Sequence, residues 1–303
     1  DVRLAAGTIT AGGTLGILIP PSIMLVVMGP ILNVPVTDLF AAAIMPGLML
    51  AVLYTGYTLI RCHLNPSLGP VVPDDLIPET MKEVWVEFFK GLVPPVLLVG
   101  SSLGSILAGW ATPTEGAAMG AVGAIVLTLA YRKLTFKSFR EALLKTLEIT
   151  TLIMILVCAS NFFGSVFSRL GTPTMITEYL MLLDLPPTVL LLIIMALIFL
   201  LAWPLEWVPI VLIIIPIILP LIEQLGFNLT WFGILVAVNL QTAWLSPPVA
   251  LSAYFLKGVV PEWDLSDIYK GMMQFMAIQV VGLALIIIFP QIVLWLPTYL
   301  YGN

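Results

Sequence analysis

Residues 18–22 read Leu-Ile-Pro-Pro-Ser, and residues 245–249 repeat the pattern as Leu-Ser-Pro-Pro-Val. A second match follows each doublet, because Thr-Asp-Leu-Phe at 37–40 corresponds to Ser-Asp-Ile-Tyr at 266–269. The offsets are 227 and 229 residues, so an insertion of two residues aligns both pairs. A single Pro-Pro in an apolar segment is most often a plain kink, since membrane helices tolerate proline. Two doublets in corresponding positions predict an internal repeat.

Each doublet is expected to break its helix in two. Proline has no backbone N–H and clashes with the preceding turn, so the carbonyls before Pro20 and Pro247 lose their helix partners. Proline also suits the first turn of the next half-helix. A break therefore presents bare carbonyls on one side and free N–H groups at a positive dipole end on the other. Carbonyls of this kind suit Na⁺, and the helix start suits a carboxylate.

The composition indicates that the solvent is lipid. Of 303 residues, 60% are hydrophobic and only 10% are charged, and the mean hydropathy is +1.10. A water-soluble domain has about 25% charged residues. The net charge of −5 and the lack of a basic cluster argue against nucleic-acid binding. One His and two cysteines, Cys62 and Cys158, do not suffice for the usual zinc or iron–sulfur sites.

The apolar segments predict an all-α polytopic membrane protein. A span needs roughly 20 apolar residues, and suitable segments lie at residues 4–30, 39–60, 91–110, 116–131, 149–167, 231–256 and 272–297, the last of these being the final span. Two shorter segments, 188–203 and 207–221, are separated by Pro-Leu-Glu. They favour a re-entrant helical hairpin over residues 188–221, with two short full spans as the alternative.

The distribution of positive charge sets the orientation. Basic residues remain on the cytoplasmic side, and the basic loop at 131–145 is therefore placed inside. Counting crossings from there leaves Arg169 as the single basic residue outside. The first doublet then lies in a helix that runs outward and the second in a helix that runs inward. This is an inverted-topology repeat, as found in many secondary transporters.

Three regions are expected along the chain. Residues 1–60 hold the first broken helix and one span, as the remainder of the first repeat. Residues 61–90 hold a cytoplasmic loop and an amphipathic surface helix at 79–90, for which a partner-binding arm is the alternative. Residues 91–303 hold the second repeat, with the hairpin, the broken helix at 231–256 and the final span.

Several polar features are candidates for function. The glycine run at 11–16 permits non-helical backbone before the first break, although close helix packing is the alternative reading. Before the second break, side-chain oxygens come from Asn239, Gln241, Thr242 and Ser246. Glu206 at the hairpin tip is either a functional acid within the membrane or an interfacial acid between two tryptophans. In the stretch 112–115, a threonine cap with Glu115 in the first turn of a helix is the simplest reading.

With these motifs, the chain resembles the large membrane subunit of tripartite ATP-independent periplasmic (TRAP) transporters. The resemblance rests on the glycine–proline string at 11–22, on Thr-Pro-Thr-Glu at 112–115, on the stretch 220–226, and on residues 242–248. It implies a multi-pass protein of the bacterial inner membrane that takes up an organic acid with Na⁺ and moves by an elevator mechanism. It implies three partners besides the lipid bilayer: a small membrane subunit, a periplasmic substrate-binding protein and a carboxylate substrate.

The resemblance also assigns residues to sites. The first broken helix and its Na⁺ site would comprise Gly13, Thr14, Gly16, Ile19, Pro20, Pro21 and Ser22. The hairpin tip (Trp203, Pro204, Glu206) and the second broken helix (Thr242, Ala243, Ser246, Pro247, Pro248) would help to enclose a further Na⁺ and the substrate. Thr112, Pro113, Thr114 and Glu115 would be a scaffold motif. Because the family's early spans and first hairpin are not in this stretch, we expect it to be truncated at its N-terminus, with those segments encoded upstream of Asp1.

Two other classes of function remain as alternatives. One is a channel-like or non-transporting membrane subunit that has inherited the repeat. The other is an intramembrane enzyme, which is disfavoured because the chain has no H-E-x-x-H or G-x-S-x-G string. A primary pump is disfavoured by the lack of a G-x-x-x-x-G-K-[ST] loop.

Overall fold

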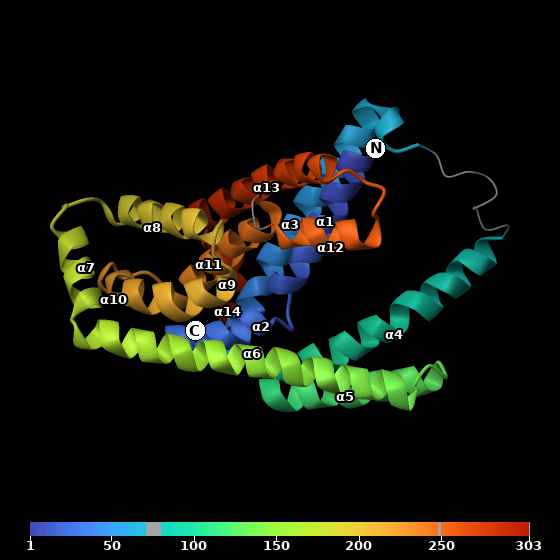
Figure 1. Cartoon of the computed structure of the whole chain (residues 1–303), viewed down its shortest axis with the longest axis horizontal. Helices are drawn as coiled ribbons and strands as arrows, with labels where there is room; N and C mark the ends of the chain where they lie inside the picture. The colour runs from blue at the N-terminus through green and yellow to red at the C-terminus, as the bar shows by residue number, and fades with distance from the viewer. Residues whose placement is uncertain (71–79, 248–249, 303) are drawn as a thin grey trace. The chain divides into compact units, whose positions relative to one another are not determined.

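The computed structural model describes residues 1–70, 80–247 and 250–302, and all of its regular secondary structure within these ranges is helical. The chain divides into two compact units. Unit 1 comprises Asp1–Leu68 and Ile155–Asn303, and unit 2 comprises Gly69–Met154. Helix α6 (Phe136–Arg169) belongs to both, because the division falls within it (Figure 1).

The helices of unit 1 hold the core. They are α1 (Val2–Leu18), α2 (Ile23–Leu32), α3 (Val36–Leu64), η1 (Pro66–Leu68), α7 (Thr172–Met181), α8 (Pro187–Ala202), α9 (Trp207–Pro209), η3 (Ile210–Ile214), α10 (Ile215–Gln224), α11 (Leu229–Leu245), α12 (Leu251–Val259), α13 (Leu265–Ile288) and α14 (Gln291–Tyr301). Helix α11 is buried along nearly its whole length. A helix that is apolar all round belongs in the interior, and α11 is therefore the central helix of unit 1.

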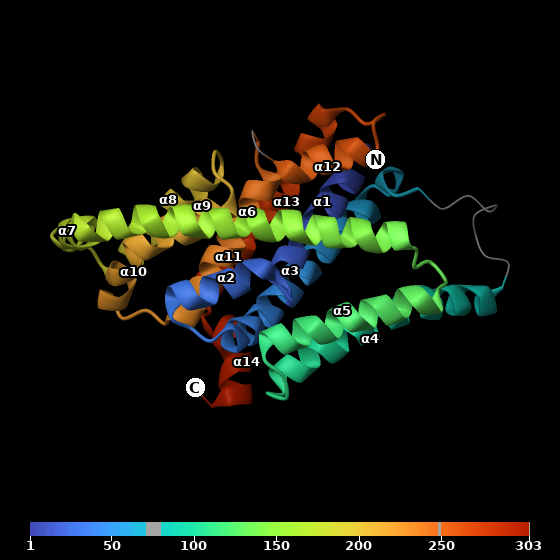
Figure 2. The same cartoon turned by 60° about the horizontal axis from the view of Figure 1, so that its bottom comes forward.

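Several described helices can cross a membrane. Six are long and apolar enough: α3, α4 (Met81–Leu107), α5 (Pro113–Ala130), α6, α13 and the continuous stretch Trp207–Gln224 that comprises α9, η3 and α10. Helices α1 and α2 pass the same test as a pair bent by 42° (Figure 2). The prediction of an all-helical, multi-pass membrane protein is confirmed.

The two proline doublets break their helices as predicted. Helices α1 and α11 each have 17 residues and end just before a doublet. Each is followed by a short helix, α2 or α12, and then by a long one, α3 or α13. The packing is reciprocal, because α1 contacts α12 and α11 contacts α2.

The direction of the long helices follows from their contacts. Tyr57 of α3 donates a hydrogen bond to Oε1 of Gln274 of α13, 2.6 Å away. At the middle of α3, Leu50 packs against Gly282, which lies further along α13. Residue numbers fall along α3 as they rise along α13 from one contact to the next, so the two helices are antiparallel. Helix α1 is parallel to α13 over its first turns, where Arg3 Nε pairs with Asp267 Oδ1 at 2.9 Å.

Two predicted helix boundaries are wrong. The predicted surface helix at 79–90 and the predicted span at 91–110 form one helix, α4, which contains Pro94 and Pro95. Thr80 caps its start by accepting from the Glu83 N–H at 3.3 Å. The helix passes through Gly91 because glycine only weakens a helix and does not end it.

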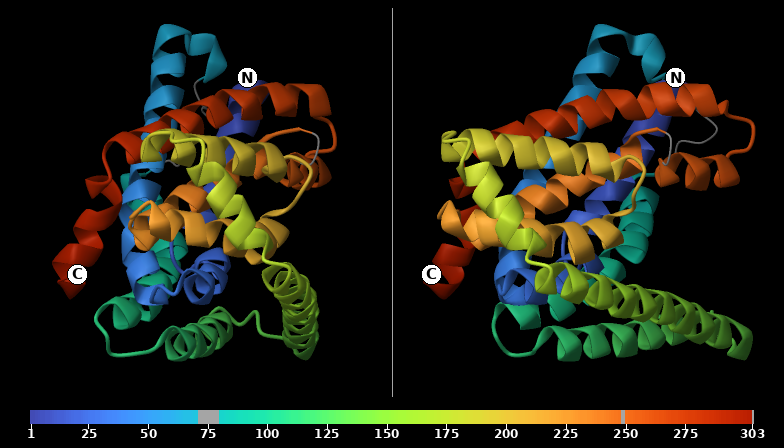
Figure 3. Two further views of the ribbon diagram at one scale, coloured as in Figure 1. Left: turned by 90° about the vertical axis from the view of Figure 1, so that its left-hand side faces the viewer. Right: turned by 60° about the vertical axis from the view of Figure 1, so that its left-hand side comes forward.

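The final span is not continuous either. Helix α13 ends at Ile288, and α14 begins at Gln291 after the chain turns at Pro290 (red, Figure 3). Pro290 has no N–H for the carbonyl of Ile286, four residues before it. The indole Nε1 of Trp231 donates to that carbonyl instead, at 3.1 Å.

Candidate functional site

The first break lies between Leu18 and Ile23. Ile19 leaves the helix with extended backbone angles, φ −68° and ψ 124°. The hydroxyl of Ser22 caps the end of α1 and the start of α2. It donates to the carbonyl of Ile17 and accepts from the N–H of Leu25. The Ile17 carbonyl needs this donor, since its ordinary helix partner would be the N–H that Pro21 lacks.

The other residues predicted for the first break differ in how far they are buried and in what they contact. Pro20 is buried and Pro21 is exposed. Ile19 packs over Gly47, where a Cβ would lie 2.5 Å from the Ile19 side chain. The Gly16 carbonyl has no helix donor, because Pro20 is the fourth residue after it.

The glycine run before the break is helical, which corrects the prediction of non-helical backbone. All of residues 11–16 lie within α1. Thr14 is 1% exposed and its hydroxyl donates to the Ala11 carbonyl at 2.8 Å. No atom lies within 4 Å of the position that a Cβ would take at Gly13 or Gly16, so both residues lie on an open face of the helix. The residues after Gly16 still supply helix N–H groups up to Ile19, so the helix ends only where the prolines remove the donors.

The second break lies between Leu245 and Leu251. Ser246 is extended, with φ −108° and ψ 132°. Its side chain is buried, and its Oγ has no hydrogen-bond partner within the described residues. Because Pro247 has no N–H, the carbonyl of the buried Ala243 loses its helix donor. Pro248 lies outside the described residues.

A buried polar network joins the two broken helices. Gln241 of α11 donates through Nε2 to the carbonyl of Thr14 in α1, at 3.1 Å. Gln279 of α13 donates to Oε1 of Gln241 at 2.7 Å and to the carbonyl of Val238 at 3.0 Å. The two glutamine side chains are at most 1% exposed. Three helices therefore meet through amide groups inside an apolar core.

Further polar atoms line the same helix. Asn239 donates to the carbonyl of Met195 at 2.8 Å, and the Thr242 hydroxyl donates to the Asn239 carbonyl at 2.6 Å. Three buried oxygens, Asn239 Oδ1, Ser246 Oγ and Gln279 Oε1, lack a partner within the described part of the chain. An unpaired buried oxygen is costly, and hard cations prefer oxygen ligands.

Gln279 is a residue of this network that the sequence pattern did not reveal. The apolar stretch 272–297 holds three glutamines, Gln274, Gln279 and Gln291, and nothing in the pattern alone separates a buried amide from a lipid-facing or interfacial one. The usable signal was the position of Gln279 inside the stretch, since a polar side chain at membrane depth faces the interior of a bundle and marks function.

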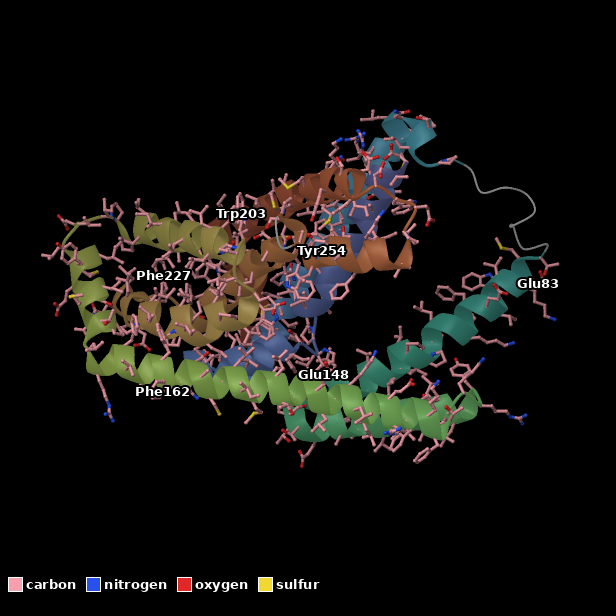
Figure 4. All side chains as sticks on the ribbon, in the orientation of Figure 1. Glu83, Glu148, Phe162, Trp203, Phe227 and Tyr254 are labelled. Atoms are coloured by element: carbon pink, nitrogen blue, oxygen red, sulfur yellow. The ribbon has the colours of Figure 1, made fainter. Side chains whose placement is uncertain are left out.

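Residues 203–206, the predicted hairpin tip, connect α8 to α9. Trp203 lies at the end of α8 (Figure 4), with its Nε1 buried and without a partner in the described residues. Pro204 and Glu206 are exposed, and Glu206 occupies the position before α9 without capping it. The helical stretch that begins at Trp207 extends to Gln224, three residues beyond the predicted end of the hairpin, and is long and apolar enough to cross a membrane.

The stretch 112–115 in unit 2 is a complete capping box. Thr112 accepts from the N–H of Glu115 at 3.3 Å, and the carboxylate of Glu115 accepts from the N–H of Thr112 at 2.8 Å. Pro113 opens α5, where its missing N–H costs nothing. Thr114 makes no cap contact. The cap reading of this motif is confirmed.

These features define a class: a multi-pass helical membrane protein whose buried polar centre joins two helices broken at prolines. The family model of the DctM component of tripartite ATP-independent periplasmic transporters matches residues 1–292. The chain belongs to this family and is therefore a transporter subunit, not an enzyme.

Three named relatives illustrate the likeness. The chain is 30% identical over 301 residues to the sialic acid TRAP transporter large permease protein SiaM of Vibrio cholerae, which covers 98% of this chain and 68% of that protein. It is 30% identical to the C4-dicarboxylate TRAP transporter large permease protein DctM of Pseudomonas aeruginosa, over 97% of this chain and 67% of that protein. It is 28% identical to the 2,3-diketo-L-gulonate TRAP transporter large permease protein YiaN of Escherichia coli, over the same shares. The chain thus spans about two thirds of the length of these relatives.

Proposed function

We propose that the protein couples the entry of Na⁺ to the uptake of an organic acid, and that the two helix breaks in unit 1 supply the ion sites. The observation that carries the proposal is the buried contact between the two broken helices through Gln241 and Thr14. This contact brings together the helix segments that lead to both breaks, and each of these segments has a carbonyl without a helix donor.

The chemistry of this centre supports Na⁺ rather than a transition metal. The available ligands are carbonyl, hydroxyl and amide oxygens, which suit hard cations. The carbonyls of Gly16 and Ala243 lack helix donors, and Ser246 Oγ is buried without a partner in the described residues. Each break therefore has neutral oxygens. These oxygens could replace the water molecules of the hydration shell of Na⁺.

An inverted repeat is part of the proposal. Helices α3 and α13, which are equivalent at the offset of 229 residues, are antiparallel. Helix α1 starts beside the start of α13, where Gly7 packs on Gly271, and α11 starts beside the start of α3, where Gly233 packs on Leu39. This reciprocal arrangement supports a two-fold axis that inverts one half onto the other. An elevator motion of the centre is the mechanism that the family resemblance adds.

The orientation rests on the clustering of charge. Arg3, Arg61 and Lys270, all placed inside by their sequence positions, lie at one end of unit 1. Arg3 pairs with Asp267, which is 3.9 Å from Lys270 Nζ. Arg61 donates to the hydroxyl of Tyr57, which donates to Gln274 on the same helix as Lys270. A basic end of this kind supports a cytoplasmic face.

The names of the relatives support a proposal for the substrate and the partners. The three named above carry sialic acid, C4-dicarboxylates and diketogulonate in their names, and all of these are carboxylates. We therefore assign an organic acid to this protein, delivered by a periplasmic binding protein, with a small membrane subunit as partner in the bacterial inner membrane.

The test is uptake into proteoliposomes by the complete transporter with its binding protein. Uptake should require an inward Na⁺ gradient and should saturate. Ser246→Ala should raise the Na⁺ concentration for half-maximal uptake several-fold, because it removes an unpaired oxygen at the second break. Ser105→Ala is the matched control, since Ser105 is buried in unit 2 and its hydroxyl already donates to Ser102. Flux without saturation or ion dependence would instead indicate a channel-like subunit.

A further inference from the structure

A second polar region of unit 1 lies away from the broken helices. A hollow of about 600 Å³ lies between the C-terminal end of α6, the start of α7 and the proline-bearing helices η3 and α10. We call it the α6–α10 hollow; its lining residues on α6 include Ser160, Asn161, Ser165, Ser168 and Arg169. Small-molecule sites in proteins have volumes of about 300–1,000 Å³, so this one is large enough for a small solute.

One residue that lines the hollow, Ser160, is buried and has a hydroxyl without a partner in the described part of the chain. Ser160 is 5% exposed and is the one buried residue of α6. Within the described residues its side chain makes no hydrogen bond, although serine in a helix commonly donates to a carbonyl of the preceding turn. Ser165, one turn further on, does this with Asn161 at 2.7 Å. The Ser160 hydroxyl is thus left available to a ligand in the hollow.

The mouth of the hollow is electropositive. Arg169 is the single charged residue among the described residues that line it, and it makes no ion pair or hydrogen bond in the described part of the chain. The start of α7 adds to this charge. Its N-cap is Gly171, which has no side chain to cap the helix, so N–H groups of the first turn, such as that of Thr174, lack acceptors. A helix start with free N–H groups attracts anions.

A simpler explanation accounts for only part of this arrangement. An arginine at the end of α6 stabilises that helix through its dipole, and this would explain Arg169 alone. It does not explain an unpaired serine in a buried position about two and a half turns before the end of the helix, in the lining of a space with several hydroxyl groups. A solute with a carboxylate and further hydrogen-bonding groups could contact both residues, since both line the same hollow.

From these observations we propose that the α6–α10 hollow binds an organic carboxylate, as a second solute site separate from the broken-helix centre. Arg169 and the start of α7 would hold the carboxylate, and the Ser160 hydroxyl would contact a polar group of the solute body. Arg169 is the basic residue that the charge distribution places on the outer side, so the site would receive solute before it reaches the centre.

One test separates this site from the ion sites by kinetics. In proteoliposomes with the complete transporter, Arg169→Gln should raise the KM for the transported acid about tenfold or more, because a charge-assisted hydrogen bond is lost. The Na⁺ concentration for half-maximal uptake should not change. Arg169→Lys should restore part of the affinity. An unchanged KM in Arg169→Gln would overturn the proposal, and a changed Na⁺ response alone would assign Arg169 to ion coupling instead.

A second test does not depend on transport. After replacement of Cys62 and Cys158, Ser165→Cys places a thiol in the hollow, where it can be labelled by anionic and cationic methanethiosulfonates. The anionic reagent should react faster relative to the cationic one, and Arg169→Gln should reduce this ratio several-fold. N-acetylneuraminate, succinate or diketogulonate should protect the thiol in a saturable manner. Equal rates for both reagents, or protection by phosphatidylglycerol vesicles and by none of the acids, would contradict a carboxylate site. This readout remains informative if the Na⁺ proposal fails.

Discussion

Gln241 donates a hydrogen bond to the carbonyl of Thr14, and the two residues are 227 positions apart. This is the offset that aligns Pro20 with Pro247, so each residue contacts its own counterpart in the repeat. In a molecule with internal two-fold symmetry, only residues near the axis can do this. The pair therefore indicates where an axis would pass, at a point six residues before each proline doublet.

The glutamine pair of this centre should be energetically coupled. Gln241→Leu should lower the free energy of unfolding by about 1–3 kcal/mol, because it removes one hydrogen-bonding partner from a buried amide. Gln279→Leu should cost a similar amount. The double variant should cost less than the sum, since neither amide is then left unpaired by the loss of the other. Denaturation of the purified protein in detergent measures the cycle, and strict additivity would show that the 2.7 Å contact contributes nothing.

The glycines of α1 should differ sharply in their tolerance of a methyl group. A Cβ on Gly7 would lie 2.6 Å from the ring of Phe275, and a Cβ on Gly271 would clash with the backbone carbonyl of Arg3. Gly7→Ala and Gly271→Ala should each destabilise the protein by about 1–3 kcal/mol or more through overpacking.

Gly12→Ala is the matched control, since nothing lies within 4 Å of its Cβ. It should be neutral or stabilising by up to about 1 kcal/mol, because alanine favours a helix. Thermal melting in detergent reports all three changes. Equal losses for Gly12→Ala and Gly7→Ala would show that the packing of α1 on α13 is not as described.

The capping box of α5 gives a prediction for unit 2. Thr112→Ala should lower stability by about 1 kcal/mol, since Thr112 satisfies an N–H of the first turn. Thr114→Ala should change stability little, because its hydroxyl takes no part in the cap. Melting of the two variants side by side checks the assignment, and the reverse order of effects would contradict it.

The helix breaks could be predicted from the sequence only in part. Two proline doublets illustrate this. The doublet at 20–21 ends α1, whereas the doublet Pro94–Pro95 lies inside α4 without ending it. Ser22 follows the first of these and caps a new helix, but Pro94–Pro95 is followed by apolar residues that cannot cap. The capping residue accounts for the difference between these two doublets, although α12 begins after the break at Pro247 without a side-chain cap.

The break at Pro290 shows what the pattern could not reveal. A single proline in an apolar stretch gave no reason to expect two helices. The carbonyl that Pro290 releases is satisfied by Trp231, 55 residues away in the sequence. A donor that distant has no local signature, so the break depends on tertiary structure.

The residues of the candidate site could also be predicted from the sequence only in part. Thr14, Gln241, Thr242 and Ser246 could be picked out because they precede the proline doublets at matching positions. Gln279 could not, since it lies far from both doublets and enters the centre only through the packing of α13 on α11. The helical state of the glycine run was also mispredicted, because permissive backbone is not forced to leave a helix while donors remain.

The most direct test of the central claim is the melting temperature of the complete transporter, titrated with NaCl against KCl at constant ionic strength. A ligand that binds only the folded state stabilises it by RT ln(1 + [L]/Kd), so the melting temperature should rise with Na⁺ and not with K⁺. In the double variant Pro247→Ala with Pro248→Ala, the Na⁺-specific rise should be smaller, because one of the two breaks is removed, while the protein still inserts into the membrane. The same rise in the variant and the parent protein would contradict an ion site at the broken helices.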